Sequence, residues 1–284
     1  MVERESLMIR FLYDTVLGRL CLKALVRPGF SEKIAGLLSC SASRALIRPY
    51  IRRHHILMES FEAVEYRSFN DFFTRRRRPE ALRIDQAPSH LISPCDGLLT
   101  AYPIAPECRF QVKCCSYSLE ELLRDRLLAE RYTGGLCLIF RLTPRHYHRY
   151  CYIDDGHRGE TFSLPGVLHS VRPLCCGKYP VYVQNQREYT VLHTEHFGDV
   201  IQVEVGALLV GRICNATGRG RIRRGEEKGH FEFGGSTILL LLEPGRVELE
   251  GQILRRTARG QEYPVRQGQQ IGWASVPEER SLTE

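Results

Sequence analysis

The stretch Phe231-Glu-Phe-Gly-Gly-Ser-Thr237, followed by the apolar run Ile238 to Leu242, organises the rest of the chain. Gly-Gly-Ser-Thr before an apolar run is a usual entry to a β-strand, because glycine adopts positive φ without steric cost and serine bonds nearby backbone. A second interpretation is that the paired glycines leave the Gly235 carbonyl unshielded, so that the Ser236 hydroxyl can reach it and break the chain. The remainder of the sequence must decide between a turn and a self-cleavage site.

Size and charge limit the class of protein. The 284 residues can bury a large core, and the apolar (43%) and charged (26%) fractions are those of a globular protein. The net charge of +7 suits an anionic partner, either nucleic acid or an acidic membrane surface. No recognition-helix pattern or aromatic-basic RNA motif accompanies the charge, so we expect no nucleic-acid partner.

The cysteines and the N-terminus indicate the compartment. Eleven cysteines, with no C-x-x-C, form neither a disulfide framework nor a zinc-finger spacing. The N-terminus lacks the pattern of a signal peptide, and no uncharged apolar run approaches the ~18 residues of a spanning helix. We therefore expect a peripheral protein at the cytoplasmic face of the cell membrane, without a signal peptide or a transmembrane helix.

Residues 1–60 have a helical, basic and amphipathic pattern. We expect helices at Met8–Val26, ended by Pro28-Gly29, at 31–38 with Ser31 as cap, and from Ser43 with an interruption near Pro49. They either pack on the main domain with a solvated basic face or form a membrane-associating segment that meets anionic lipid. The basic run Arg75–Arg78 has the same two interpretations, a solvated face or a contact with lipid phosphates.

Residues 61–284 are expected to form a β-rich, mainly antiparallel domain, which makes the fold class α+β. Capping boxes start helices at Ser68 and at Ser118, the second running to about Glu130. Strands are expected at Leu91–Ile104 (two strands around the turn at 94–97), Leu136–Leu142, Tyr179–Gln184, Glu188–His193, Val200–Val205, Leu208–Ile213, Thr237–Leu242 and Val247–Leu249. The alternation in Val200–Val205 is typical of a sheet with one wet face. The tail from Arg255 to Glu284 is poorly patterned and is expected to be partly mobile.

Single polar residues do not decide the chemistry. His146 and His148 follow an apolar strand and would face the same side, but no third ligand sits at a suggestive spacing, so we expect no metal. Asp96 lies in a tight turn, where aspartate is often only a turn former.

The order of several motifs is more specific than any one of them. These motifs are Ser68-Phe-Asn-Asp-Phe-Phe-Thr-Arg75, Ser93-Pro-Cys-Asp-Gly97, Tyr147-His-Arg149, Gly166-Val-Leu-His-Ser-Val-Arg-Pro173, Asn185-Gln-Arg187, Val205-Gly-Ala-Leu-Leu-Val-Gly211 and Lys228-Gly-His-Phe-Glu-Phe-Gly-Gly-Ser-Thr237. In this succession the chain resembles the phosphatidylserine decarboxylase family from about residue 60 to residue 243. The N-terminal helices match more loosely and the tail hardly at all.

The resemblance implies a self-cleaving proenzyme. Ser236 would attack the Gly235 carbonyl, and ester formation, elimination and hydrolysis would leave a long chain 1–235 and a short chain 236–284 that begins with a covalent pyruvoyl group. The two chains stay associated in such enzymes. The pyruvoyl group, through a Schiff base with the substrate amine, converts phosphatidylserine in an anionic membrane to phosphatidylethanolamine and CO2, without a metal or a diffusible cofactor.

The resemblance also implies an Asp-His-Ser relay for the cleavage, with Asp96 as the aspartate and Ser236 as the serine. The family motif has a second histidine three residues after the first, and this chain has Cys151 there. His148 is the favoured base because it lies on the matched motif and imidazole titrates near neutrality. Cys151 as a thiolate of lowered pKa is a further candidate. The other candidates are His169, His193, His196 and His230.

Two other functions stay open. Cys151 favours a processing-defective lipid-binding or interaction module on the same scaffold. A pyruvoyl decarboxylase of a soluble amino acid fits the cleavage motif, but the basic amphipathic N-terminus argues against it. The sequence leaves open whether the protein forms a homodimer.

Overall fold

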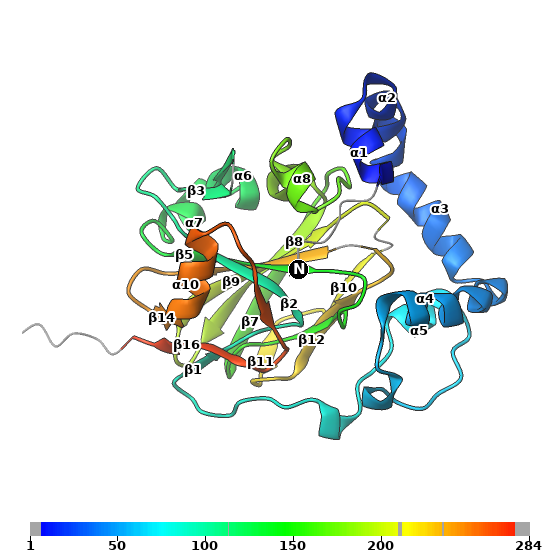
Figure 1. Ribbon diagram of the computed structural model, residues 1–284. Coiled ribbons are helices and arrows are strands. Elements are labelled where there is room, and N and C mark those ends of the chain that lie inside the picture. Colours follow the sequence, from blue (N-terminus) through cyan, green and yellow to red (C-terminus); the bar gives the residue numbers. More distant parts are fainter. Residues whose placement is uncertain (1–6, 113, 210–211, 235, 276–284) are drawn as a thin grey trace, which may run out of the picture.

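The computed structural model describes residues 7–112, 114–209, 212–234 and 236–275, and Figure 1 shows helices of the N-terminal part beside a β-rich body. The fold is α+β, as the sequence predicted. The N-terminal elements are α1 (Leu7–Asp14), α2 (Val16–Leu25), α3 (Pro28–Leu38), the 3-10 helix η1 (Ser41–Leu46), α4 (Ile47–His54), η2 (Met58–Ser60), α5 (Phe69–Phe73) and η3 (Pro79–Ala81). The later helices are α6 (Leu119–Leu123), α7 (Arg126–Glu130), α8 (Pro173–Cys176), α9 (Val181–Gln184) and α10 (Gly251–Ala258).

An eight-stranded antiparallel sheet forms the centre of the body, in the order β11-β7-β8-β9-β13-β5-β2-β15. Smaller sheets have the orders β1-β16-β14, β10-β12-β6 and β3-β4. The strands are β1 (His90–Ile92), β2 (Gly97–Pro103), β3 (Arg109–Val112), β4 (Cys115–Ser118), β5 (Leu136–Leu142), β6 (Arg149–Cys151), β7 (Gly156–Leu164), β8 (Arg187–Thr194), β9 (Gly198–Gly206), β10 (Ile213–Asn215), β11 (Gly220–Ile222), β12 (Glu227–Phe231), β13 (Ser236–Leu242), β14 (Val247–Leu249), β15 (Tyr263–Val265) and β16 (Gln270–Ala274).

Strand β13 is buried along its whole length because both faces of the main sheet are covered. On one face, Leu122 and Tyr182 from the helices pack in a cluster with Leu239. On the other face, β6, β12 and α10 supply side chains that pack with Ile238 and Leu240. A strand buried on both sides needs apolar residues at every position, which explains the continuous apolar run after Ser236.

The N-terminal helices differ from the prediction at their boundaries. The predicted helix Met8–Val26 is two helices, because Thr15 ends α1 and caps α2 by accepting the Gly18 N–H at 2.9 Å. A Cβ at Gly18 would lie 1.9 Å from the Phe11 carbonyl oxygen, so glycine allows the two helices to pack closely. Ser31 is not a cap: α3 begins at Pro28, whose fixed φ suits a first helical turn.

The helices predicted from Ser43 and from Ser118 are also divided differently. Ser43 lies in η1, and Pro49 sits in the first turn of α4 without interrupting it. Ser118 does cap α6 by accepting the Glu121 N–H, but Arg124 adopts a left-handed φ of 54° and ends that helix. A second helix, α7, then covers the rest of the predicted span.

Three strand predictions also need correction. The segment Tyr179–Gln184 is not a strand, because Pro180 precedes the short helix α9. In the described part of Leu208–Ile213, a strand begins only at Ile213. The expected wet face of β9 is dry, since Gln202 and Glu204 are 0% exposed.

The tail contains more regular structure than the sequence predicted. The segment from Gly251 to Ala274 contains α10, β15 and β16, and β15 extends the main sheet beside β2. Residues 276–284 lie outside the described residues. The two strands at Leu91–Ile104 and the capping box at Ser68 are confirmed.

Candidate functional site

One edge of the main sheet brings two of the candidate residues, Ser236 and Asp96, together. Ser236 at the start of β13 pairs with Leu142 at the end of β5 and with Gly206 at the end of β9. Gly97, which follows Asp96, opens β2 on the other side of β5. Ser236 and Asp96 therefore lie at the same edge, on strands separated by one intervening strand, which is a lateral distance of about 10 Å.

Ser236 occupies an unusual environment for a hydroxyl group. Its side chain is 0% exposed, and its Oγ has no hydrogen-bond partner among the described residues. A buried hydroxyl without a partner is unfavourable by about 1–3 kcal/mol, so such groups in native proteins call for a functional explanation. Gly234 just before it has φ +142°, a conformation that favours glycine. Gly235, the predicted carbonyl partner in the cleavage, lies outside the described residues.

His148 is a buried neutral base. Its Nδ1 lies 2.9 Å from the His146 carbonyl oxygen, and because a carbonyl only accepts, Nδ1 carries the proton and donates. The other ring nitrogen, Nε2, keeps its lone pair and is buried with no partner among the described residues. Burial lowers the pKa of His148 well below its usual value, and the neighbouring Arg75 charge lowers it further. The imidazole is thus neutral at pH 7 with a free acceptor.

Asp96 is paired with an arginine. Both carboxylate oxygens accept from Arg77, at 3.0 and 2.5 Å, and Oδ1 also accepts the Gln267 N–H at 3.0 Å. Arg77 in turn lies over the ring of Tyr147, 4.7 Å from its centroid. Across the described chain, no hydrogen bond joins Asp96 to His148. The expected relay is therefore not assembled as a direct Asp-His contact in this structure.

Three arginines of the basic run make contacts within the protein: Arg75, Arg77 and Arg78. Arg75 is only 2% exposed and lies over the rings of Phe61 and Phe72, at 4.4 and 4.9 Å from their centroids. Burial lowers its pKa to about 10, so it stays cationic at pH 7. Arg78 donates from Nε to the Phe61 carbonyl. The pairing of Arg77 was missed from the sequence, where the run indicated only a surface.

Cys151 lies beside Asp96 but lacks the properties of a thiolate base. Its N–H donates to the Pro94 carbonyl at 2.9 Å, which places it against the turn that carries Asp96. Burial raises the pKa of the Cys151 thiol to about 12, although a hydrogen bond from the Gln267 side chain lowers it in part. A thiolate base requires the opposite shift.

Two of the alternative histidines lie at the other end of the sheet. His193 pairs with Asp199 at 2.7 Å, and His196 pairs with Asp154 at 3.1 Å. Asp199 is near the start of β9 and Gly206, opposite Ser236, is at its end. At about 3.4 Å per residue the two are roughly 24 Å apart. Neither histidine reaches the Ser236 edge.

The remaining two histidines are half-buried near the N-terminal helices or on β12. His169 Nδ1 lies 3.2 Å from the Tyr13 hydroxyl, and its ring stacks on Tyr179 at 4.7 Å. Burial lowers the pKa of His169 and of His230. Only His148 combines full burial with an imidazole nitrogen that has no partner among the described residues.

A buried ion pair lies on the same face of the sheet as Ser236, and the sequence interpretation missed it. Lys228 Nζ donates to both Glu204 oxygens, at 2.8 and 2.9 Å, and to Asn215 Oδ1 at 3.0 Å. The two charged side chains are 1% and 0% exposed. Burial lowers the pKa of Lys228 and raises the pKa of Glu204, while the opposite charge of each partner counters the shift. The sequence signal for this ion pair was the alternation of polar and apolar residues in β9. We interpreted that alternation as a solvent-exposed face of the sheet.

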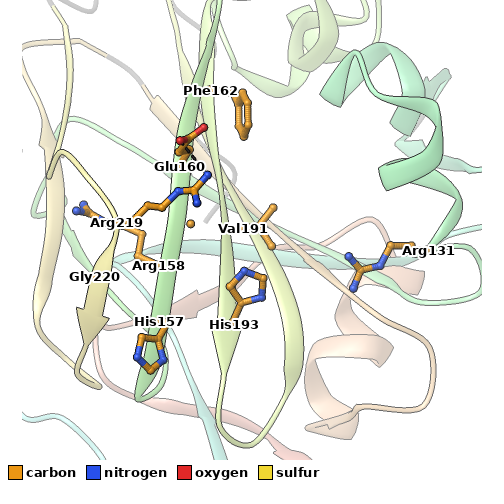
Figure 2. Close-up of a pocket in the computed structure, with 10 residues that line it drawn as sticks. Arg131, His157, Arg158, Glu160, Phe162, Val191, His193, Arg219 and Gly220 are labelled. Carbon is orange, nitrogen blue, oxygen red and sulfur yellow. Dashed lines mark ion pairs between the residues drawn. The ribbon is translucent and has the colours of Figure 1, made fainter.

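A surface cavity of about 670 Å³ lies over β7 and β8 (Figure 2). Ser236 is not among the residues that line it. His157 and His193 line one end of it and Phe162 the other. Its cations have partners: Arg219 pairs with Glu160, and Arg131 with Asp199 and Glu243. Among the described residues, no group of three or more His, Cys, Asp or Glu side chains is arranged to hold a metal ion.

Fold and site together define the class: an α+β protein whose central antiparallel sheet carries a buried serine at the start of β13, with a buried neutral histidine just before β6 of the neighbouring small sheet. A family model described as phosphatidylserine decarboxylase matches residues 69–273. The chain belongs to the phosphatidylserine decarboxylase family, which confirms the resemblance seen in the motifs. The match also extends past residue 243 into the tail, where the motifs indicated hardly any resemblance.

Relatives with this name cover nearly the whole chain. Phosphatidylserine decarboxylase proenzyme 2 of Clostridium acetobutylicum is 42% identical over 265 residues, which are 93% of this chain and 91% of the relative. The phosphatidylserine decarboxylase proenzyme of Ruminiclostridium cellulolyticum is 40% identical over 93% of this chain and 90% of its own length. That of Clostridium novyi is 38% identical, with 93% and 92% covered.

Proposed function

We propose that this chain is a phosphatidylserine decarboxylase, a carboxy-lyase that matures by cleaving itself between Gly235 and Ser236. The observation that carries the proposal is the buried Ser236 Oγ, which has no partner among the described residues and opens β13 directly after the Gly-Gly pair. Family membership supplies the substrate, phosphatidylserine, and the product, phosphatidylethanolamine.

The cleavage can be written with the residues of this chain. His148 Nε2 takes the proton of the Ser236 hydroxyl as Oγ bonds to the Gly235 carbonyl carbon, and the carbon–nitrogen bond breaks as that proton passes to the nitrogen. Loss of the Ser236 α-proton then expels the Gly235 carboxylate. Water replaces the nitrogen on the new N-terminal residue with oxygen and releases ammonia, leaving a ketone.

A pyruvoyl group formed in this way supplies the electron sink for decarboxylation of an amine-bearing substrate. Its fit to this chain rests on Ser236, because the group would stand at the head of β13, held between β5 and β9. Asp96, fixed by Arg77 and the Gln267 N–H, would place a negative charge at the same edge of the sheet.

We further propose that residues 1–60 associate with the surface of an anionic membrane, at its cytoplasmic face, while 61–284 form the decarboxylase domain. In support, α1 and α2 expose large apolar side chains: Leu7 is 84% exposed, Val16 70% and Leu17 63%. Apolar groups beside basic ones suit the headgroup boundary of a bilayer. No helix in the described part of the chain is both long and apolar enough to span a membrane.

Intact mass measurement of the purified protein tests the proposal. We expect two chains, 1–235 and 236–284, the second blocked to N-terminal sequencing, and a single uncleaved chain in the Ser236→Ala variant. Decarboxylation should be measured with phosphatidylserine vesicles and with free serine. A wild-type chain that stays intact on incubation contradicts self-cleavage, and activity on free serine alone contradicts the lipid substrate.

A further inference from the structure

The short helix α5 contacts both the segment that leads into Ser236 and the candidate base, His148. It begins at Ser68, whose Oγ accepts the Asp71 N–H, and it buries Phe69, Phe72 and Phe73. Its own position is fixed from the N-terminal part, because the Phe69 N–H donates to Ser43 Oγ at 2.9 Å. Residues 69–73 are far in sequence from the cleavage segment, so contacts between the two are a property of the fold.

The first contact holds the chain just before the cleavage site. The Phe233 N–H donates to the Asn70 Oδ1 atom at 3.1 Å. The Phe233 ring meets Phe69 and Phe73 edge-on, with centroids 5.2 Å away in each case. Phe233 directly precedes Gly234, where the backbone turns with φ +142°. The hydrogen bond and the two rings therefore fix the entry to that turn.

The second contact holds the candidate base. The ring of Phe73 lies 4.2 Å from the His148 ring, with an angle of 39° between the planes. One phenylalanine thus touches both the histidine and Phe233. Because both contacts come from one rigid helical turn, α5 fixes the position of His148 relative to the chain that leads into Ser236.

We propose that α5 is a positioning element for self-cleavage, in which Asn70 holds the Phe233 N–H so that the Gly235 carbonyl is presented to Ser236. The inference rests on the proposed self-cleavage and adds a residue to it. Attack within a chain depends steeply on how the reacting groups are held, so loosening the entry to the turn should slow the reaction. After cleavage Phe233 belongs to the free end of the long chain, and decarboxylation no longer needs it held.

The test compares cleavage with decarboxylation in the full-length chain. The time course of cleavage is followed after synthesis in a cell-free translation reaction for wild type, Asn70→Ala and Asn70→Asp. Loss of one hydrogen bond should slow cleavage about fivefold in Asn70→Ala. Asn70→Asp keeps an oxygen acceptor and should stay within about twofold of wild type. Decarboxylation per cleaved molecule should stay within about twofold in both variants, because cleavage leaves Phe233 only two residues from the free end of the long chain.

A matched control comes from the same helix. Asp71 accepts the Arg67 N–H at 2.8 Å, and no hydrogen bond joins it to Phe233 in the described part of the chain, so Asp71→Ala removes a comparable hydrogen bond at the start of α5 and leaves the Asn70–Phe233 contact in place. This variant should cleave at the wild-type rate. Equal slowing of Asp71→Ala and Asn70→Ala, or an Asn70→Ala chain that cleaves normally, overturns the inference while leaving self-cleavage intact. A wild-type chain that does not cleave overturns the proposed function itself.

Discussion

At the scale of single residues, the site depends on two buried atoms without partners among the described residues, Ser236 Oγ and His148 Nε2. The tautomer of His148 is set by the His146 carbonyl, a task that the expected relay gave to Asp96. Asp96 is engaged by Arg77 instead. A backbone carbonyl cannot take up a proton, so it orients the imidazole at any pH.

The pH dependence of cleavage should report the environment of His148. Its pKa is lowered by burial, so the ring stays neutral as the pH falls through 6.5, and Nε2 remains able to accept a proton. We expect a cleavage rate that is level from pH 8 to about 6.5 and falls only at lower pH.

The lowered pKa of His148 also affects stability. In the unfolded chain the His148 ring binds a proton near pH 6.5, and in the folded chain it does not. Stability from this group is therefore complete above pH 6.5 and is lost as the pH falls below it.

Two variants test whether His148 or Cys151 is the base for cleavage. His148→Gln removes the base and should slow cleavage by about 10²-fold or more. Cys151→Ser should cleave within about threefold of wild type, because a thiol whose pKa is raised to about 12 by burial is not a base at pH 7. Both rates are measured at pH 7.5 in cell-free translation. A loss of cleavage in Cys151→Ser with little effect in His148→Gln would reverse the assignment.

At the scale of elements, the sequence predicted the strands whose pattern is set by local burial. Strands β5 and β14 have the predicted bounds, and β13 begins one residue earlier than predicted. The predicted bounds and burial were wrong where tertiary contacts determine the local structure. Thr15 splits a continuous amphipathic pattern by capping α2, and the polar residues of β9 point into a second covered layer. The candidate site shows the same difference. The order of the motifs was enough to predict Ser236 and Asp96. The contacts of Arg77 and Asn70 could not be predicted, because they depend on packing between segments far apart in the sequence.

The ion pair between β12 and β9 gives a prediction for these elements. Lys228→Met leaves the Glu204 carboxylate buried without its cation and should lower the free energy of unfolding by about 3–5 kcal/mol. Adding Glu204→Gln should recover part of the loss because no buried charge remains. The measurement is urea unfolding in the uncleaved Ser236→Ala background, which avoids a mixture of chains.

An exposed ion pair serves as the control. Lys178 pairs with Asp14, and their side chains are 39% and 40% exposed. Lys178→Met should therefore change the free energy of unfolding by less than about 1 kcal/mol. A Lys228→Met loss no larger than that of Lys178→Met would mean that the buried pair contributes little to joining the two layers.

At the scale of the whole molecule, the N-terminal helices pack on both sides of the Ser236 edge. The Leu168 N–H donates to the Val26 carbonyl at 2.8 Å, beside the Gly206 end of β9. On the other side, the Tyr50 hydroxyl donates to the Pro144 carbonyl at 2.8 Å, just past the end of β5. The N-terminal part therefore contacts the protein near the ends of both strands that flank β13.

The same architecture predicts how the cleaved protein behaves when it unfolds. Strand β13, which would belong to the proposed short chain, lies between β5 and β9 and is paired along its whole length, while β15 pairs with β2. The eleven cysteines are free thiols, so after cleavage these contacts and the buried core would hold the chains together. We expect the two chains to co-elute in buffer and to separate in urea. Refolding after urea removal should depend on protein concentration for the cleaved protein, because two chains must meet, and should be independent of it for Ser236→Ala. Concentration-independent refolding of the cleaved protein would show that the long chain keeps its fold, and its hold on β13, without the rest of the sheet.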